Sequence, residues 1–168
     1  SVFISIPKRW VQLYELMKET LDLDLASEKS LRAMLENYTG GNLKWGLSAA
    51  GYLDPDIFRF FHNNKIELIS GYGMTEATGG ITMTPPGDYV VNSVGKSLPG
   101  IELKISSDGE LCMRGPYVSN GFYKTKKSIS FKKGWFHSGD IFEQKDGHYF
   151  ILDRKKDIYK NSRGQTIA

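Results

Sequence analysis

The chain has 168 residues, and 40% of them are hydrophobic, which is enough to bury a core and excludes disorder as the leading interpretation. Its 22 basic and 19 acidic residues nearly balance, so the charge does not predict a nucleic-acid partner. The single cysteine, Cys112, excludes an internal disulfide framework and is expected to be a small buried residue of a cytoplasmic protein. The missing initiator Met and the abrupt end predict a piece of a longer protein.

Apolar residues at helical spacing open the chain. The segments from Trp10 to Leu21 and from Leu31 to Tyr38 each predict an amphipathic helix, and Gly40-Gly41 is expected to end the second. An apolar run over residues 43–47 then predicts a short strand.

A third helix is expected to begin at Asp54-Pro55, because aspartate is a good N-cap and proline a good first helical residue. The segment His62-Asn63-Asn64 should end it, and residues 66–69 predict a strand that runs into a glycine-rich loop at Gly71. Strand, helix and strand in this order predict parallel neighbours, and ligands bind beyond the carboxyl ends of such strands.

After Pro85-Pro86-Gly87 the apolar residues alternate with polar ones, which is typical of antiparallel strands. The dipeptides Asp108-Gly109 and Asp146-Gly147 stand between alternating segments and predict two hairpins. We therefore expect an α/β fold: an α/β layer over residues 1–84, a twisted or barrel-like antiparallel sheet over 85–153, and a charged connector over 154–168.

Residues 71–80 combine four glycines, a hydroxyl, a carboxylate and an aromatic ring directly after a predicted strand, and each suits one part of MgATP. Gly73 lets backbone N–H groups approach a phosphate, and Thr75 can donate a hydrogen bond to it. Glu76 can hold Mg²⁺, and the ring of Tyr72 can stack on a base. A glycine-rich turn with a solvated glutamate fits the composition equally well.

Two charged residues further along suit the same ligand. The carboxylate of Asp140 can accept two hydrogen bonds at once, which matches the neighbouring hydroxyl groups of a ribose. The planar guanidinium of Arg154 offers several donors to a ribose oxygen or a phosphate. A surface ion pair is the alternative interpretation of both residues.

These segments resemble four blocks of the adenylate-forming superfamily, which includes acyl-CoA synthetases, adenylation domains and luciferases. The blocks follow the order of the family, and four in the right order are hard to explain by chance. They are Tyr72-Gly73-Met74-Thr75-Glu76, then Gly109–Gly115 with Gly121-Phe122-Tyr123, then Gly134–Asp140, and finally Asp153–Ile158 with Gly164 and Ile167.

The resemblance implies a function for single positions. Thr75 and Glu76 are expected to serve catalysis, with Glu76 also on the metal ion. The residues expected to bind the nucleotide are Tyr72, Gly73, Thr75, Asp140 and Arg154. His137 is expected to line the site or support it, because the acid is already ionised near pH 7 and needs no general base.

Two further positions follow from the resemblance. Ala50 and Gly51 should line the acyl site, although Ser48 to Tyr52 departs from the family's Ser-Gly-Gly-Ala-Pro run. Lys156 falls at the family's hinge, so residues 154–168 are expected to hold the hinge and the start of a C-terminal domain. Residues 1–153 would then be part of the large AMP-binding domain.

The implied reaction consumes ATP with Mg²⁺ to form acyl-AMP and then transfers the acyl group to CoA. The segment Phe3 to Trp10 and the aspartate before Arg154 resemble long-chain fatty acid CoA ligases. Enzymes of aryl acids or carrier proteins, and a non-catalytic β-rich interaction module, remain the alternatives. The exposed lysines at 124–133 leave peripheral membrane contact open. These residues include no complete phosphate loop or C-terminal domain, so the isolated chain is expected to be inactive.

Overall fold

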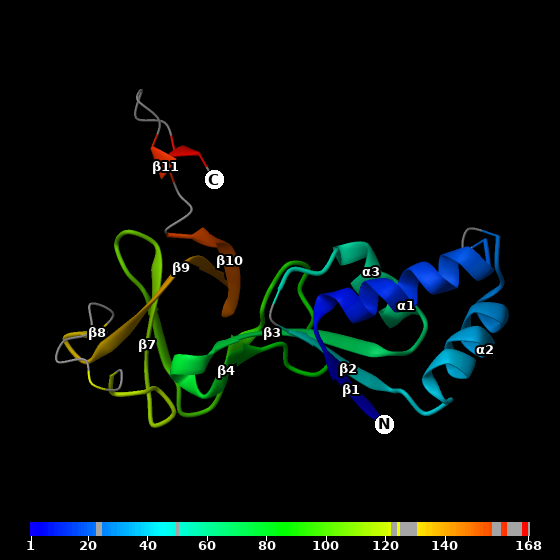
Figure 1. Cartoon of the computed structure of the whole chain (residues 1–168), viewed down its shortest axis with the longest axis horizontal. Coiled ribbons are helices and arrows are strands. Elements are labelled where there is room, and N and C mark those ends of the chain that lie inside the picture. Colours follow the sequence, from blue (N-terminus) through cyan, green and yellow to red (C-terminus); the bar gives the residue numbers. More distant parts are fainter. Residues whose placement is uncertain are drawn as a thin grey trace. The chain divides into compact units, whose positions relative to one another are not determined.

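The computed structural model describes residues 1–22, 25–49, 51–121, 124, 131–155, 159–160 and 166–167. The chain folds into two compact units that interleave along the sequence (Figure 1). The first comprises Ser1–Gly71 and Thr84–Val91, and the second comprises Tyr72–Met83 and Asn92–Ala168. The sequence predicts boundaries near residues 84 and 153.

The first unit is built on parallel strands. Strand β2 (Trp45–Ala49) pairs in parallel with β1 (Val2–Ser5) on one side and with the first half of β3 (Glu67–Met74) on the other. Helices α1 (Pro7–Thr20) and α2 (Glu28–Thr39) connect β1 to β2, and α3 (Pro55–Asn63) connects β2 to β3. Helices α1 and α3 lie on the same side of these strands (Figure 1), as right-handed crossovers between sequential strands require. The predicted parallel α/β layer is confirmed.

Capping residues fix two helix ends where the sequence predicts them. The carboxylate of Asp54 accepts a hydrogen bond from the backbone N–H of Asp56 at 2.8 Å at the start of α3. Gly40 ends α2 in the left-handed conformation, with φ of 73°. None of the described helices has the length and apolar character needed to cross a membrane.

The core of the first unit centres on Trp10 of α1, which is fully buried. Its indole meets the ring of Phe61 edge to face, with 5.1 Å between the ring centroids. Gly46 of β2 lies under the same indole, and a Cβ at that position would be only 2.3 Å from the ring. A glycine in β2 is therefore what lets α1 pack closely on the strands.

The second unit is antiparallel. Strand β4 (Gly79–Met83) pairs with β5 (Lys96–Ser97). A larger sheet has the order β10 (His148–Arg154), β9 (Trp135–Lys145), β7 (Glu110–Arg114) and β6 (Glu102–Ile105), with β8 (Phe131–Lys132) beside β9. Strands β11 (Tyr159–Lys160) and β12 (Thr166–Ile167) form a separate ladder.

The larger sheet is open among the described strands, because β10 and β6 each have one neighbour in it. The predicted antiparallel sheet is confirmed, whereas its closure into a barrel is not found in the described part of the chain. Both hairpins form as predicted: Asp146 and Gly147 have φ of 50° and 81°, the pair of left-handed residues of a two-residue turn.

The two faces of the larger sheet differ in character. Leu111 and Met113 point into a core that also holds Phe136, Phe142 and Tyr149. The alternate residues Glu110, Cys112 and Arg114 of β7 lie on the opposite face, where Cys112 is opposite His137 of β9. The prediction of a buried Cys112 is confirmed.

The predicted glycine loop begins later than expected, because Gly71 to Met74 continue strand β3. The turn itself is the short helix η1 (Thr75–Ala77), after which β4 returns. An ideal Cβ on Gly73 would lie 2.0 Å from the carbonyl oxygen of Gly79. Gly73 therefore serves a close approach between backbone segments, a use of glycine that composition does not distinguish from a phosphate loop.

Candidate functional site

Three of the predicted site residues meet around the Asp140 carboxylate in the second unit. The Tyr72 hydroxyl donates a hydrogen bond to Oδ2 of Asp140 at 2.5 Å. The Nε–H of Arg154 donates to Oδ1 at 3.2 Å. Asp140 is only 6% exposed, while Arg154 is largely exposed. A nearly buried carboxylate is thus held from two sides, by one neutral and one cationic donor.

The position of Asp140 results from a bulge in strand β9. Three residues, Ser138–Asp140, stand opposite the single residue Leu111 of β7. The Ser138 hydroxyl accepts the backbone N–H of Asp140 at 3.1 Å inside this bulge. Strand β10 places Arg154 directly opposite Asp140 in its register with β9. Bulges commonly re-aim a side chain beside a site, and this one brings Asp140 to Arg154 and Tyr72.

An aromatic contact holds the ring of Tyr72 in place. Its ring meets Phe142 edge to face, with 4.9 Å between the ring centroids. Burial, and next the hydrogen bond to the Asp140 carboxylate, raise the pKa of Tyr72 well above its ordinary value. The hydroxyl therefore remains protonated and donating throughout the physiological pH range.

The Asp140 carboxylate has unused hydrogen-bonding capacity. An ionised carboxylate has about four lone-pair positions, and Tyr72 and Arg154 each occupy one. Two donors, such as adjacent hydroxyl groups of a sugar, can still be accepted. The exposed guanidinium of Arg154 can at the same time turn its remaining N–H groups toward an anion.

Thr75 and Glu76 lie on η1 of the same unit, directly after the strand that carries Tyr72. Thr75 is exposed and Glu76 is half-buried, so the hydroxyl is open to a ligand. The last residue of this turn, Ala77, is buried in the core and anchors it. The Ser119 N–H also donates a hydrogen bond to the Glu76 carbonyl at 2.7 Å. The polar side chains thus project from a held backbone.

The structure does not test the remaining predicted positions. Gly51 belongs to the first unit, where it is exposed beside Pro7. Ala50 and Lys156 lie outside the residues that the structure describes. Their expected roles at the acyl site and at the hinge stay predictions.

Glu110 is a charged residue at this site that the sequence motifs do not single out for a role. It is 5% exposed and accepts three hydrogen bonds: from the Gly139 N–H at 2.9 Å, from Lys155 Nζ at 2.8 Å and from His137 Nδ1 at 3.1 Å. Burial would raise its pKa, but these three donors together hold the pKa of Glu110 below its usual value. The carboxylate is therefore ionised at neutral pH.

Lys155 completes this cluster. Its Nζ also donates to Asp108 Oδ2 at 2.6 Å, and the two hydrogen-bonded carboxylates raise the pKa of Lys155. The sequence predicts a solvated lysine in a charged connector, and Lys155 is indeed exposed. Its pairing with these two carboxylates is not predicted from the sequence. Spacing along the chain does not reveal the pairing, because Asp108 and Lys155 are 47 residues apart.

Cys112 and His137 do not form a nucleophilic pair. The Sγ atom of Cys112 and the Glu110 carboxylate both approach the same ring nitrogen of His137, Nδ1, at 3.4 and 3.1 Å. A base that activates a thiol uses one nitrogen for the thiol and the other for the supporting carboxylate. Burial, and next the charge of Glu110, also raise the pKa of the Cys112 thiol, which disfavours the thiolate.

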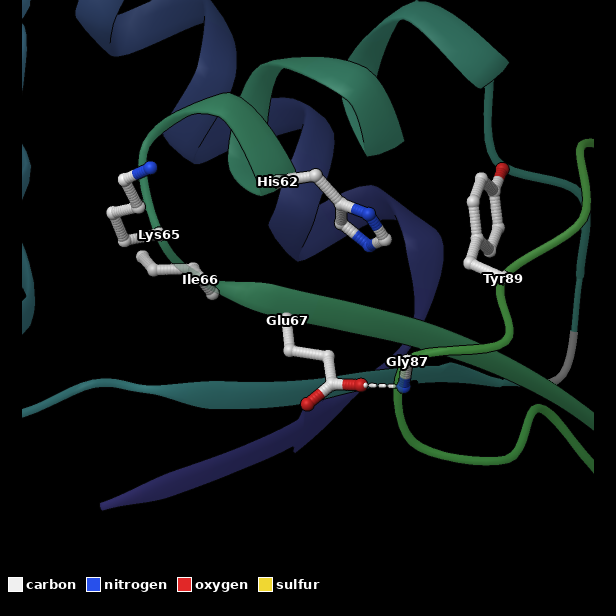
Figure 2. A pocket seen from close by; sticks show the side chains of 6 residues that line it. All are labelled: His62, Lys65, Ile66, Glu67, Gly87 and Tyr89. Atoms are coloured by element: carbon white, nitrogen blue, oxygen red, sulfur yellow. Dashed lines mark hydrogen bonds between the residues drawn. The ribbon is translucent and has the colours of Figure 1, made fainter.

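A cavity of about 460 Å³ lies elsewhere, in the first unit. It is lined by His62, Lys65, Ile66, Glu67, Gly87 and Tyr89 (Figure 2). Figure 2 shows the Glu67 carboxylate directed at the backbone N–H of Gly87, from which it accepts a hydrogen bond at 2.5 Å. Ile66 and Glu67 precede and begin β3, so this cavity is at the amino end of the parallel strands. Ligand sites of parallel sheets lie at the opposite end.

The family of the chain follows from comparison with known proteins. The model of the family described as "AMP-binding enzyme" matches residues 1–123, well over half of the chain. The chain belongs to this AMP-binding enzyme family. The match includes Tyr72, Thr75 and Glu76, whereas Asp140 and Arg154 follow it in the sequence.

Curated relatives in the family are ligases of fatty acids. The chain is 33% identical to long-chain-fatty-acid–CoA ligase FadD15 of Mycobacterium bovis over 143 residues, which are 83% of this chain and 23% of that protein. It is 34% identical to fatty acyl-CoA synthetase A of Dictyostelium discoideum over 161 residues, which are 84% of this chain and 24% of that protein. The chain spans about a quarter of the length of the curated relatives it matches.

Solved structures of AMP-binding enzymes share the fold. An o-succinylbenzoate CoA synthetase from Bacillus subtilis, in complex with its acyl-adenylate intermediate, superposes with a TM-score of 0.75 at 21% identity, covering 99% of this chain and 33% of that chain. The same synthetase with ATP and magnesium gives 0.73 at 22% identity, covering 99% and 34%. The parallel layer and the antiparallel sheet are therefore part of this fold.

The described residues fit a magnesium nucleotide by their chemistry. A nearly buried carboxylate with free lone pairs, an exposed guanidinium and an exposed hydroxyl match a ribose and a phosphate chain. No group of three or more His, Cys, Asp or Glu side chains in the described part of the chain could hold a metal ion. Mg²⁺ needs no such group, because it is commonly held by one or two carboxylates, water and substrate phosphates.

Proposed function

We propose that the chain is part of an AMP-forming acid–thiol ligase of the long-chain fatty acid CoA ligase type. The observation that carries the proposal is the shared hydrogen bonding of Tyr72 and Arg154 to the Asp140 carboxylate. Three residues from separate sequence blocks meet there with the donors and acceptors that a nucleoside phosphate needs. The natural polypeptide that carries these residues is called the parent protein below.

Each residue of the site has a proposed task. The free lone pairs of Asp140 accept the two ribose hydroxyls, and Tyr72 keeps the carboxylate oriented while its ring borders the base. Arg154 offers donors to a ribose oxygen or to the α-phosphate. Thr75 donates to the phosphate, and Glu76 supplies the protein's oxygen to Mg²⁺, which draws charge from the phosphates.

The chemistry follows from this placement. A carboxylic acid at neutral pH is an anion without a leaving group, so it cannot be attacked by a thiol. In-line attack of the acid on the α-phosphate of ATP gives acyl-AMP and pyrophosphate, and the thiol of CoA then displaces AMP. Such phosphoryl chemistry depends mainly on positioning and on neutralising charge, which are the two contributions these residues make.

We further propose that the acid substrate is a fatty acid. It is supported by the names of the relatives that are 33% to 34% identical, and by the likeness of Phe3 to Trp10 to the long-chain branch. The solved structures named above act on an aryl acid, at 21% to 22% identity. An aryl acid is therefore the second candidate, and it is weaker on identity.

The domain layout is also proposed. Residues 1–84 and 85–153 contribute to the large AMP-binding domain, and residues 154–168 contain the hinge, with Lys156 at its pivot, and the start of a C-terminal domain. Ala50 and Gly51 are proposed to line the acyl site. The likeness of the chain's fold to that of the adenylate-bound synthetase supports this layout.

The test is equilibrium binding to the parent protein. Titration calorimetry compares non-hydrolysable sulfamoyl mimics of palmitoyl-adenylate and benzoyl-adenylate. We expect tighter binding of the palmitoyl mimic and about 10-fold to 100-fold weaker binding after Asp140→Asn, since hydrogen bonds to charged groups contribute roughly 1.5 to 3 kcal/mol. Tighter binding of the benzoyl mimic would favour the aryl acid, and binding of neither would reject the ligase.

A further inference from the structure

We propose that Glu110 is a positioning residue of the nucleotide site, which holds Asp140 and Arg154 in the geometry that receives the ribose. The inference rests on the proposed function, because it concerns the same site. Within the described part of the chain, Glu110 makes no hydrogen bond to either of these two side chains. It acts on the residues beside them.

The first contact fixes the bulge that carries Asp140. Oε1 of Glu110 accepts the backbone N–H of Gly139 at 2.9 Å, one residue before Asp140. The bulge places Ser138–Asp140 opposite one residue of β7, so regular strand pairing with β7 does not supply this acceptor. The Glu110 carboxylate supplies it in place of a backbone carbonyl.

The second contact fixes the end of β10. Oε2 of Glu110 accepts a hydrogen bond from Lys155 Nζ at 2.8 Å, one residue after Arg154. The backbone N–H of Lys155 in turn donates to the Gly139 carbonyl at 2.9 Å. Glu110, Gly139 and Lys155 therefore form a closed ring of hydrogen bonds that joins β7, the bulge of β9 and the end of β10.

The burial of Glu110 argues that this ring of hydrogen bonds has a positioning role. A carboxylate with 7% of its side chain exposed loses most of its hydration, and this cost offsets much of what its ion pair with the more exposed Lys155 contributes to stability. Stability alone is therefore a poor account of a glutamate here. The directional contacts to Gly139 and Lys155 explain it, because an apolar residue cannot hold an N–H group in place.

The experiment measures recognition of the ribose rather than overall activity. The parent protein and its Glu110→Gln and Asp140→Asn variants are titrated with two ligands, the palmitoyl sulfamoyl-adenosine mimic and its 2′,3′-dideoxy form. The ratio of the two dissociation constants reports how well Asp140 meets the hydroxyls. We expect the wild-type ratio to be at least about 10, the Asp140→Asn ratio to approach one, and Glu110→Gln to reduce the wild-type ratio about fivefold or more.

A matched control and a second readout make the test specific. Glu102→Gln removes another glutamate of the same sheet face, whose partner Arg114 is exposed, and should leave the ratio unchanged. Hydrogen exchange of a peptide covering Gly139 should become faster in Glu110→Ala, in which the acceptor is lost, and stay unchanged in Glu102→Gln. Both readouts are independent of turnover.

The outcomes separate the two ideas. If the wild-type protein binds neither mimic, the proposed function fails. If it discriminates through Asp140 but Glu110→Gln keeps the full ratio, the positioning role alone is overturned. Equal weakening of both ligands by Glu110→Gln, with an unchanged ratio, would show a purely structural glutamate and would likewise overturn it.

Discussion

The Tyr72 hydroxyl and the Asp140 carboxylate are joined by a hydrogen bond of 2.5 Å across 68 residues of sequence. Tyr72 lies on β3 and Asp140 in the bulge of β9, so the bond connects two of the four sequence blocks that resemble the adenylate-forming superfamily. Burial and this carboxylate raise the pKa of Tyr72, so its hydroxyl stays protonated at neutral pH and donates this hydrogen bond. The phenolic proton thus helps to orient Asp140, together with Arg154.

Removing that proton by Tyr72→Phe should weaken binding of the palmitoyl-adenylate mimic to the parent protein about 10-fold, because a hydrogen bond to a charged group is lost. The aromatic contact with Phe142 is kept, so the fold should persist. Titration calorimetry measures the change. Tyr38→Phe, which removes an exposed hydroxyl of the first unit, is the control, and equal affinities of the two variants would contradict the role of Tyr72.

Gly46→Ala should destabilise the parent protein by at least about 2 kcal/mol, because overpacking of a filled core costs roughly 1 to 3 kcal/mol. The added methyl group would lie 2.3 Å from the Trp10 ring. Urea unfolding measures the loss, and a double mutant with Trp10→Leu identifies its cause. The alanine should cost much less in that background, whereas strictly additive effects would point to another origin.

The stability difference between the wild-type protein and Glu110→Gln should depend on pH. The pKa of Glu110 is lowered in the folded state, so its carboxylate stabilises the fold above the unfolded pKa of about 4.3, and this contribution is lost as pH falls through the folded pKa. Unfolding by urea at pH 7 and at pH 3 should therefore show a larger difference at pH 7. Glu143→Gln, an exposed position of β9, is the matched control. A difference that grows toward acid would contradict the ion pairing seen for Glu110.

The isolated 168-residue chain should form no palmitoyl-CoA from palmitate, ATP and CoA under conditions in which the parent protein does. The chain spans about a quarter of the length of the curated relatives it matches, so it carries only part of the proposed site. Each lost donor to the transition state typically costs a factor of about 100 to 1000. Thioester formation is followed by mass spectrometry. Turnover by the isolated chain at the rate of the parent protein would refute this expectation.

Local sequence signals predict the elements whose causes are local. The Asp54 cap, the Gly40 terminator and the Asp146-Gly147 turn each act within a few residues, and all three function as expected. The strand β1 is different, because its apolar residues Val2 and Ile4 are both exposed and no alternation marks a buried face. Its parallel pairing with β2 depends on contacts some forty residues away, which local patterns do not carry.

The site shows the same division. Motif order predicts Tyr72, Asp140 and Arg154, and the structure brings these three together. The extension of β3 through Gly73 was missed, because a glycine needed for close backbone approach has the same composition as a glycine in a phosphate loop. The sequence does not predict that Glu110 and Lys155 pair. Their pairing depends on the bulge in β9, and a bulge leaves no periodic pattern of apolar and polar residues in the sequence.

The attachment of Lys155 also has a mechanical consequence. The last residues of an edge strand usually fray, yet here the backbone N–H of Lys155 is held by Gly139 and its ammonium group by Asp108 and Glu110. A pull on the chain beyond Lys155 is therefore borne by β7 and the bulge before it can peel β10 from the sheet. The backbone of Arg154, one residue inside this anchor, is therefore held to the sheet at a position where a strand would otherwise loosen.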